Sequence, residues 1–282
     1  MLLKGTTAIK KYLPSITLKG DKFVFDDAII FAENELKNNI LGTALYNRFT
    51  REETEDADAR EIINRIIAIN AFLSVISDMD VVLTEAGFAV QNSENLAPAS
   101  KQRVEALTNS LRTRVDASTD ALLDLLITSI SYDEEWRTSE QYNRLSAGLI
   151  ITYKDFKHVA ILTRENIEFY PQSYSAMSTL YAKMAFALRS LVSSFLGITF
   201  IEKLIEDIRD REPLSSETLT ILPIIKSAVV AYAMDDKTSG NNIMTTVVSY
   251  MNKNKSAFPS VVEYRQGIPD GAHSDTPIFS ML

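Results

Sequence analysis

Cysteine is absent from this 282-residue chain, histidine occurs only twice, and glycine only nine times. Without cysteine there is no disulfide, no thiolate metal ligand and no thiol nucleophile. The two histidines, His158 and His273, are far apart and form no His-x-x-x-His metal pair. The glycines are scattered singly, so no glycine-rich turn is available to cradle a phosphate at a helix N-terminus. These absences exclude most of the sequence patterns that indicate an enzyme.

Long uncharged apolar runs are also missing, and the first residues lack the apolar core of a signal peptide. The two most hydrophobic segments, residues 62–76 and 219–234, contain asparagine and arginine or proline and lysine. Both are typical of buried helices. We therefore expect no membrane contact and synthesis as a soluble cytoplasmic polypeptide. The hydrophobic fraction of 46% and charged fraction of 23% are those of a globular protein, and the net charge of -8 argues against wrapping nucleic acid.

The most informative positive feature is an internal similarity. Residues 31–42 align with residues 186–197, with five identities in twelve positions, namely Phe, Ala and Leu followed by Leu-Gly at the end. An apolar, basic, apolar pattern follows in both copies, and a second apolar helical run follows after a shift of three residues. Repetition at a fixed distance is typical of proteins built from repeated helical units. The sequence thus predicts a mainly α fold of two related helical-bundle halves.

Apolar spacing predicts the helices. Steps of three and four residues predict an amphipathic helix ending near Gly42. The acidic residues 51–61 are interpreted as an exposed loop, and the next helix has an apolar face broad enough to be contacted from two sides. Two further helices are expected on either side of residues 116–120. Residues 147–170 are ambiguous between strand and helix, and helices return from residue 174. One helix is expected to open at Pro213 and Ser215, and one more short helix around residues 243–251.

A β-hairpin and two terminal arms complete the expected organisation. Two β-rich runs near residues 80–91 are separated by Glu-Ala-Gly, which predicts a projecting hairpin. The expected divisions are a basic N-terminal arm, a first half containing the hairpin, a second half, and an extended C-terminal arm. These cover residues 1–22, 23–146, 147–258 and 259–282. The N-terminal arm has one possible short helix, around residues 7–13. It is interpreted as a partly ordered, solvated terminus, although it could also dock on an acidic neighbour or on phosphate.

No constellation of catalytic residues emerges from the motifs. Asp155 could orient His158, but no Gly-x-Ser-x-Gly turn supplies a nucleophile, so His158 is interpreted as a surface or interface residue. The acidic run lacks the spacing of a calcium loop and is interpreted as solvated charge. The aromatic residues, including Phe25 and Phe200, are interpreted as core. We expect no catalytic residue, no metal and no cofactor.

The order of these elements carries a resemblance. A helix ending in Leu41-Gly42 is followed by the acidic run, an apolar helix, the hairpin and a linker reaching residues 97–104. This order is similar to helical virion proteins of phages and prophages of gut bacteria, including the crAss-like phages. In outline it resembles the head-to-tail connector (adaptor) proteins of tailed phages, whose subunits form a ring beneath the portal and extend the DNA channel. This chain is longer than most such subunits.

The resemblance implies a structural virion protein at the head–tail junction and no enzymatic activity. It implies a homo-oligomeric ring of twelve subunits that contacts portal and tail proteins, with DNA passing through without specific binding. The candidate interface residues lie on the arms and at the hairpin tip: Lys4, Lys10, Lys11, Gly87, Phe88, Ile278 and Phe279. Two alternatives stay open: a cytoplasmic helical-repeat adaptor that binds a host or phage protein, and an enzyme of an unrecognised type.

Overall fold

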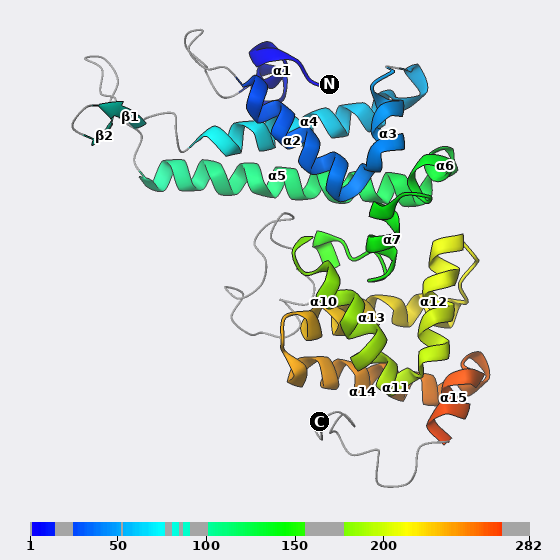
Figure 1. Cartoon of the computed structure of the whole chain (residues 1–282). Helices are drawn as coiled ribbons and strands as arrows, with labels where there is room; N and C mark the ends of the chain where they lie inside the picture. Colours follow the sequence, from blue (N-terminus) through cyan, green and yellow to red (C-terminus); the bar gives the residue numbers. More distant parts are fainter. Residues whose placement is uncertain are drawn as a thin grey trace. The chain divides into compact units, whose positions relative to one another are not determined.

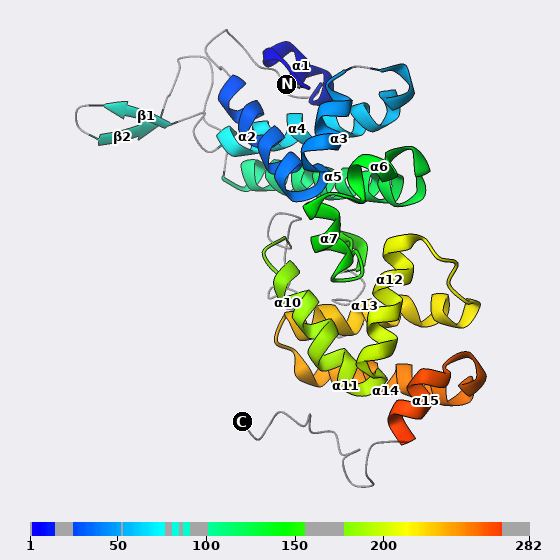
Figure 2. The same ribbon diagram turned by 45° about the vertical axis from the view of Figure 1, so that its right-hand side comes forward.

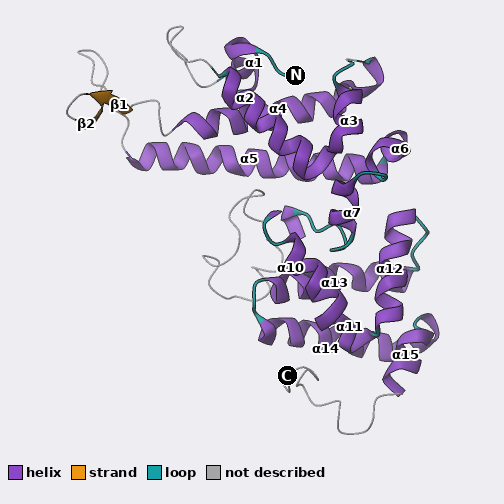
Figure 3. Ribbon diagram, in the orientation of Figure 1, coloured by secondary structure: helices purple, strands orange, loops and turns teal. Residues whose placement is uncertain are grey.

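The computed structural model describes residues 2–14, 25–51, 53–76, 81–84, 87–90, 101–155 and 178–266. Most of these residues are helical (Figure 1), and Figure 3 shows the helices in purple. The prediction of a mainly α protein is therefore confirmed. The chain divides into two compact units, Met1–Gln141 and Tyr142–Leu282, here called unit 1 and unit 2. The division falls within helix α7 (Glu140–Ser146).

Unit 1 is built around two long helices, α4 (Ala57–Val75) and α5 (Lys101–Thr128), which pack side by side (Figure 1). Helix α2 (Asp26–Leu36) packs on α4 and continues through a π-helical turn, η1 (Lys37–Leu41), into α3 (Gly42–Phe49). The other described elements of the unit are α1 (Gly5–Tyr12), η2 (Thr54–Asp56), β1 (Val81–Thr84), β2 (Gly87–Val90), η4 (Ile130–Tyr132) and α6 (Asp133–Trp136).

The core of unit 1 includes the apolar stripe predicted for α2. Side chains at three- and four-residue spacing lie on one side of a helix, and this side faces α4. Burying an aliphatic or aromatic side chain fully contributes about 1.5–3 kcal/mol. Helix α4 contacts α1, α2 and α5, so the prediction that it is covered from more than one side is also confirmed. The stripe residues, each at most 8% exposed, are Phe25, Ala28, Ile29, Ala32, Leu36 and Ile40.

The short helix expected in the basic arm is present as α1, but residues 2–14 are packed in unit 1 and not solvated as predicted. Helix α1 packs on α4 and buries Ile9 and Leu13 almost completely. The Glu33 carboxylate accepts the backbone N–H groups of the second and third residues at 2.6 and 2.9 Å. Ile9 and Leu13 are one helical turn apart, and their burial outweighs the preference of the neighbouring lysines for solvent.

Helix α5 is a single helix of 28 residues, not the two helices predicted around residues 116–120. The expected break came from a cluster of Asp, Ser and Thr, which are poor helix formers because their side chains compete for backbone groups. Here the hydroxyls of Ser118 and Thr119 donate to the carbonyls of Arg114 and Val115, one turn earlier, at 2.8 and 2.9 Å. The side chains therefore bond along the helix without interrupting it.

Two short strands lie between α4 and α5 in sequence. β1 and β2 pair antiparallel, with Val81 opposite Val90 and Thr84 opposite Gly87. Figure 2 shows the two strands side by side. The pairing places Gly87 at the start of the second strand, with Phe88 one step further on.

Unit 2 begins with part of α7 and, after a stretch outside the described residues, continues through α10 (Tyr181–Phe186). A π-helical turn, η6 (Ala187–Val192), leads into α11 (Ser193–Leu196), and Gly197 separates α11 from α12 (Ile198–Asp210). Two longer helices then pack against each other. These are α13 (Ser216–Ala233) and α14 (Lys237–Lys253), followed by η7 (Lys255–Ala257) and α15 (Pro259–Gln266).

Helix α13 is the most apolar helix of unit 2. By length and composition it could cross a membrane, but half of it is buried inside the protein. It begins as predicted after Ser215, whose hydroxyl accepts the backbone N–H of Thr218 at 3.1 Å as an N-cap. The buried residues concentrate in its second half, next to α14, so the prediction of a buried helix is confirmed.

Helix α14 starts earlier than the predicted short helix around residues 243–251. Asp236 caps its N-terminus by accepting the backbone N–H of Ser239 at 3.0 Å. The first turn can lie close to α13 because Gly240 has no side chain. A Cβ on that glycine would be 2.5 Å from a ring carbon of Tyr232. The small residue therefore fixes how closely the two helices approach.

The C-terminal arm predicted over residues 259–282 is wrong for its first part. Residues 259–266 form α15, which packs on α11 and α12. Val261 is 1% exposed, and the Tyr264 hydroxyl donates to the Ser194 carbonyl at 3.1 Å. One buried valine per two turns gives too weak a pattern to indicate this helix from sequence. Residues 267–282 lie outside the described residues.

The segment predicted as ambiguous between strand and helix is described only up to residue 155. There the chain leaves α7 through Leu149 and Ile150, which have positive φ angles of 69° and 51° and are both buried. The carboxylate of Asp155 accepts the backbone N–H of Thr152 at 2.8 Å. His158 belongs to residues 156–177, which lie outside the described residues.

The order of elements in unit 1 recurs in unit 2. In each unit a helix passes through a π-helical turn, reaches a glycine with positive φ, and continues as another helix. Two long helices that pack on each other follow, then a short 3-10 turn and a short final helix. The corresponding helices, in order, are α2 and α10, α3 and α12, α4 and α13, α5 and α14, and α6 and α15.

Candidate functional site

The glycine junctions are the most distinctive local geometry in both units. Gly42 has φ 75° and ψ 170°, and Gly197 has φ 84° and ψ 140°. L-residues with a Cβ rarely adopt such angles, whereas glycine adopts them readily. Gly42 directly follows the π-helical turn of unit 1, and Gly197 follows the short α11 after the π-helical turn of unit 2. Each junction changes the direction of the chain before the next helix, α3 in unit 1 and α12 in unit 2.

Both junctions are covered by residues from the end of their unit. A Cβ at Gly42 would lie 2.8 Å from Oε1 of Gln141 and 2.9 Å from Cβ of Ser139. A Cβ at Gly197 would lie 2.9 Å from Cγ of Tyr264. Any larger residue would therefore push the final segment of the unit away from the junction.

Hydrogen bonds from these final segments satisfy backbone carbonyls near each junction. Trp136 is fully buried, and its Nε1 donates to the carbonyl of Ile40 inside the π-helical turn at 2.8 Å. In unit 2, Tyr264 and Arg265 donate to the carbonyls of Ser194 and Phe195, each at 3.1 Å. Carbonyls at irregular helix positions and helix ends lose their intrahelical partners and need such donors. The junctions are therefore held by contacts that span the length of each unit.

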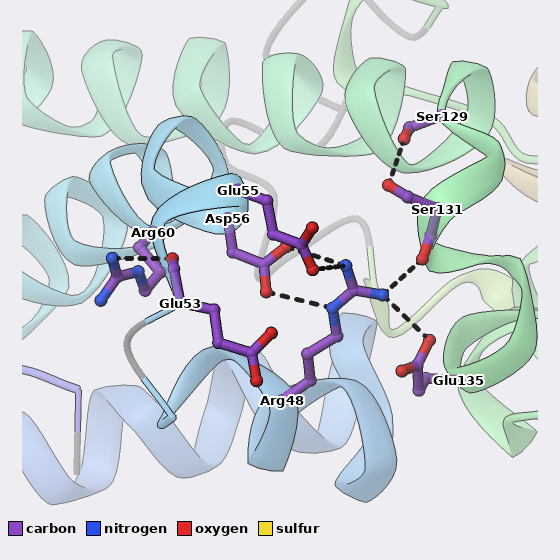
Figure 4. A network of polar contacts seen from close by, with 8 residues as sticks. All are labelled: Arg48, Glu53, Glu55, Asp56, Arg60, Ser129, Ser131 and Glu135. Atoms are coloured by element: carbon purple, nitrogen blue, oxygen red, sulfur yellow. Dashed lines mark hydrogen bonds and ion pairs between the residues drawn. The ribbon is translucent and has the colours of Figure 1, made fainter.

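A buried ion-pair network fixes the segment after α3 in unit 1 (Figure 4). The Arg48 guanidinium binds both carboxylate oxygens of Asp56 at 3.0 Å and lies 3.5 Å from Glu55. On its other side it lies 3.4 Å from Glu135 and donates to the Ser131 carbonyl. Figure 4 shows the guanidinium between these two groups of acceptors. One arginine thereby connects α3, the acidic segment and the final helices of the unit.

This network corrects the expectation of an exposed acidic loop at Asp56, whereas Glu53, Glu55 and Asp58 are exposed as expected. The Asp56 side chain is only 1% exposed, and that of Arg48 only 13%. The hydrogen bond with Asp56 raises the pKa of Arg48, and burial is the main reason that the pKa of Tyr132 is raised. The Tyr132 ring lies 4.9 Å from the guanidinium carbon, a cation–π distance. A buried, bidentate pair of this kind positions chain segments and leaves no solvated carboxylate at Asp56.

A second buried carboxylate anchors the N-terminal segment. Glu33, 4% exposed, accepts the Tyr46 hydroxyl at 2.8 Å besides the two backbone N–H groups described above. Burial, and then the hydrogen bond with Glu33, raise the pKa of Tyr46 to about 12. At the aligned positions unit 2 has two buried apolar residues, Leu188 and Ile201. The aligned positions of unit 2 therefore lack a counterpart of the Glu33–Tyr46 pair, which in unit 1 holds the N-terminal segment through Glu33.

The predicted interface lysines lie on the N-terminal segment that is packed in unit 1. Lys4 and Lys10 are exposed, and no described residue forms an ion pair with either. Lys11 instead bonds Glu61 of α4 at 2.7 Å, which raises the pKa of the lysine and lowers that of the carboxyl. Both partners remain substantially exposed to water. Lys11 therefore already has a partner within its own chain.

The other predicted contacts are only partly described. Gly87 and Phe88 are the first two residues of β2. Ile278, Phe279 and the second histidine lie in the C-terminal stretch outside the described residues. All seven predicted interface residues therefore stay predictions.

Two exposed aromatic residues were missed by the sequence analysis, which interpreted aromatic residues as core. Phe31 is 58% exposed and Phe186 is 64% exposed. They occupy the same place in the two aligned segments, and the alanine that follows each is buried. The signal was present in the sequence, because both phenylalanines lie off the apolar stripe of their own helix.

The described residues contain no cluster of three or more Asp, Glu or His side chains that could hold a metal ion. The buried carboxylates of Glu33 and Asp56 are already bound by backbone N–H groups, a tyrosine and an arginine. The distinctive features of the described residues are therefore the two glycine junctions and the exposed Phe31 and Phe186.

Comparison with known proteins gives one family match. The model of a family of unknown function, DUF6712, matches residues 21–146. This stretch ends at the same residue as the first helical half expected from sequence. No curated protein and no solved structure matches the chain. Since the function of the matched family is unknown, the match assigns neither an activity nor a partner.

Proposed function

We propose that this chain is a structural, non-enzymatic protein of a tailed-phage particle, located in the head–tail connector. In that role identical subunits form a ring below the portal, extend the DNA channel and join the capsid to the tail. The ring would contain twelve subunits if it follows the symmetry of the connector proteins that the sequence resembles. Its partners would be portal and tail proteins.

The observation that carries this proposal is the recurrence of one helical design in two units. Proteins that supply shape and contact surface are commonly built from repeated helical units. We infer that the two units arose by duplication. The inference is supported by the two π-helical turns, the positive φ angles of Gly42 and Gly197, and the matched exposed phenylalanines. Ile67 and Ile225, aligned after the three-residue shift, are both fully buried.

The charge of the chain supports a channel through which DNA passes. A net charge of -8 repels the phosphate backbone, so DNA would slide without being held. The projecting hairpin with Gly87 and Phe88, the exposed Lys4, and the C-terminal residues Ile278 and Phe279 are proposed to reach neighbouring subunits. Such segments can add strands to a neighbour or pack into its grooves.

The mass and shape of the purified full-length chain test this proposal. We expect light scattering after size-exclusion chromatography to give a large multiple of the 31.6 kDa chain mass, and electron micrographs to show closed rings. Binding of the ring to purified portal protein would place it at the connector. A chain that stays monomeric at every concentration, with or without portal protein, would contradict the proposal and favour a helical-repeat adaptor.

A further inference from the structure

The two exposed phenylalanines lie on helix faces of opposite charge. In α2, Asp27 and Glu35 lie four residues before and after Phe31, so all three are on one side of the helix. Asp27 is exposed and Glu35 half-buried, and no described residue forms an ion pair with either. We call these three residues the Phe31 face. It is an apolar centre between two carboxylates.

The corresponding face of unit 2 is basic. Lys183 and Arg189 lie three residues before and after Phe186, and both are exposed. Lys183 lies 3.0 Å from Asp235, and Nε of Arg189 bonds Glu202 at 2.9 Å. These are solvated surface pairs, which are weak and easily exchanged. The Nη groups of Arg189 have no partner among the described residues. We call Lys183, Phe186 and Arg189 the Phe186 face.

We propose that the Phe31 face of one copy of this chain binds the Phe186 face of a second copy. The choice of a second copy follows from charge complementarity. An acidic face and a basic face attract each other, whereas two Phe31 faces, or two Phe186 faces, would place like charges together. A symmetric two-fold dimer through either face is therefore disfavoured.

A contact between two different faces is heterologous, and it leaves one unused face at each end of a pair. Such a contact propagates from copy to copy until it closes a ring or extends as a filament. This inference deepens the proposed function, on which it rests for the closed ring, by naming the surfaces that join neighbouring subunits. The two aromatic rings would form the buried centre of a larger interface, because exposed aromatic residues are the usual anchors of such interfaces.

Truncation of each aromatic anchor is the first test. In the full-length chain, Phe31→Ala and Phe186→Ala are each expected to raise the concentration at half-assembly at least tenfold, measured by light scattering or sedimentation. Leu219→Ala is the matched control, because Leu219 is a large apolar residue of similar exposure, 55%, outside both faces. Circular dichroism of each variant checks that the helices are intact.

Charge reversal then identifies the partner face. Glu35→Lys and Arg189→Glu should each weaken assembly, because each places like charges across the contact. Mixing the two variants should restore assembly, since the lysine introduced at position 35 of one copy then meets the glutamate introduced at position 189 of the other. The unchanged faces of the two variants meet as well. A contact within a single chain would be impaired in each variant and would not be rescued by mixing.

The outcomes separate this inference from the proposed function. If wild-type rings form and the phenylalanine variants assemble like Leu219→Ala, the contact is wrong and the ring proposal stands. If the charge variants are not rescued by mixing, the contact between copies is likewise wrong. If the wild-type chain never assembles, both the ring and this contact are overturned.

Discussion

Arg48 connects three parts of unit 1 that are distant in sequence. Its guanidinium supplies the positive charge that faces the buried Asp56 carboxylate, and it also reaches Ser131 and Glu135. A buried carboxylate that loses its cation keeps its desolvation cost without the compensating attraction. The stability of unit 1 should therefore depend on this one side chain more than on any surface pair.

Replacing Arg48 with alanine should lower the free energy of unfolding by about 3–5 kcal/mol, the usual cost of breaking a buried ion pair. Urea unfolding followed by circular dichroism measures this change. Lys203→Ala is the matched control, because Lys203 occupies the aligned position in unit 2 but pairs with Asp207 in an exposed i, i+4 contact. The control should unfold like the wild type. Equal effects of the two substitutions would contradict the role assigned to the network.

Tyr46 gives a prediction at alkaline pH. Its pKa of about 12 in the folded protein lies above the ordinary value of 10.0, because burial and Glu33 disfavour the phenolate. The raised pKa means that the stabilising contribution is complete below pH 10 and is lost as the pH rises through about 12. Urea unfolding at several pH values should therefore show a steeper loss of stability above pH 10 in the wild type than in Tyr46→Phe. Identical pH profiles would contradict it.

At the scale of elements, the glycine junctions require both a special backbone conformation and a close neighbour. Gly197→Ala should destabilise the chain by about 1–3 kcal/mol through backbone strain alone, and further through the clash with Tyr264. Gly5→Ala separates the two effects, because Gly5 also has a positive φ, 72°, but open space around it. Thermal unfolding should rank Gly197→Ala below Gly5→Ala. In a chain that already carries Tyr264→Ala, Gly197→Ala should destabilise less, because the clash with the Tyr264 ring is absent and only the backbone strain is left.

The hydrogen bond from Trp136 to the π-helical turn can be tested with a near-isosteric change. Trp136→Phe leaves the buried Ile40 carbonyl without a donor, which should cost about 1–3 kcal/mol, to which the smaller ring adds a packing loss. The corresponding change in unit 2, Tyr264→Phe, removes a half-buried hydroxyl and should cost about 0.5–1.5 kcal/mol. Denaturant unfolding compares the two. A larger effect in unit 2 would contradict the assigned importance of burial.

Much of the helical framework could be predicted from local spacing. The buried stripe of α2, the cap at Ser215 and the positive φ at Gly42 all depend on residues within one or two helical turns. The errors came from contacts between distant residues. Asp56 looked solvated because local spacing does not show its bond with Arg48, which also reaches Ser131, and the polar segment around Trp136 gave no indication that the indole bonds Ile40. Local patterns carry no information on such pairings.

The packing of residues 2–14 and the helix over residues 259–266 were mispredicted for a different reason. Both α1 and α15 are short helices with only one or two fully buried apolar residues, so neither produces a clear periodic pattern. Their stability comes from packing on longer helices, which is the general rule for short helices. The exposure of Phe31 and Phe186 was missed for another reason. Each lies off the apolar stripe of its own helix, but aromatic residues in general were interpreted as core.

At the scale of the whole molecule, the C-terminal residues 267–282 can be removed without deleting any described core residue. The truncated chain should therefore keep the circular dichroism spectrum and thermal midpoint of the wild type. If Ile278 and Phe279 contact a neighbouring subunit, as the sequence predicts, assembly should weaken, and light scattering measures this. Normal assembly of the truncated chain would contradict the role of these residues.

The π-helical turns have a consequence for how the two units are compared residue by residue. Such a turn holds an extra residue relative to an α-helical turn, and each residue advances an α-helix by about 100°. Deleting a single residue from residues 37–41 would therefore rotate everything downstream by that angle and turn the apolar side of α3 outward. Both units carry a π-helical turn before the glycine junction, but the turn of unit 2, residues 187–192, ends four residues earlier relative to its glycine than the turn of unit 1.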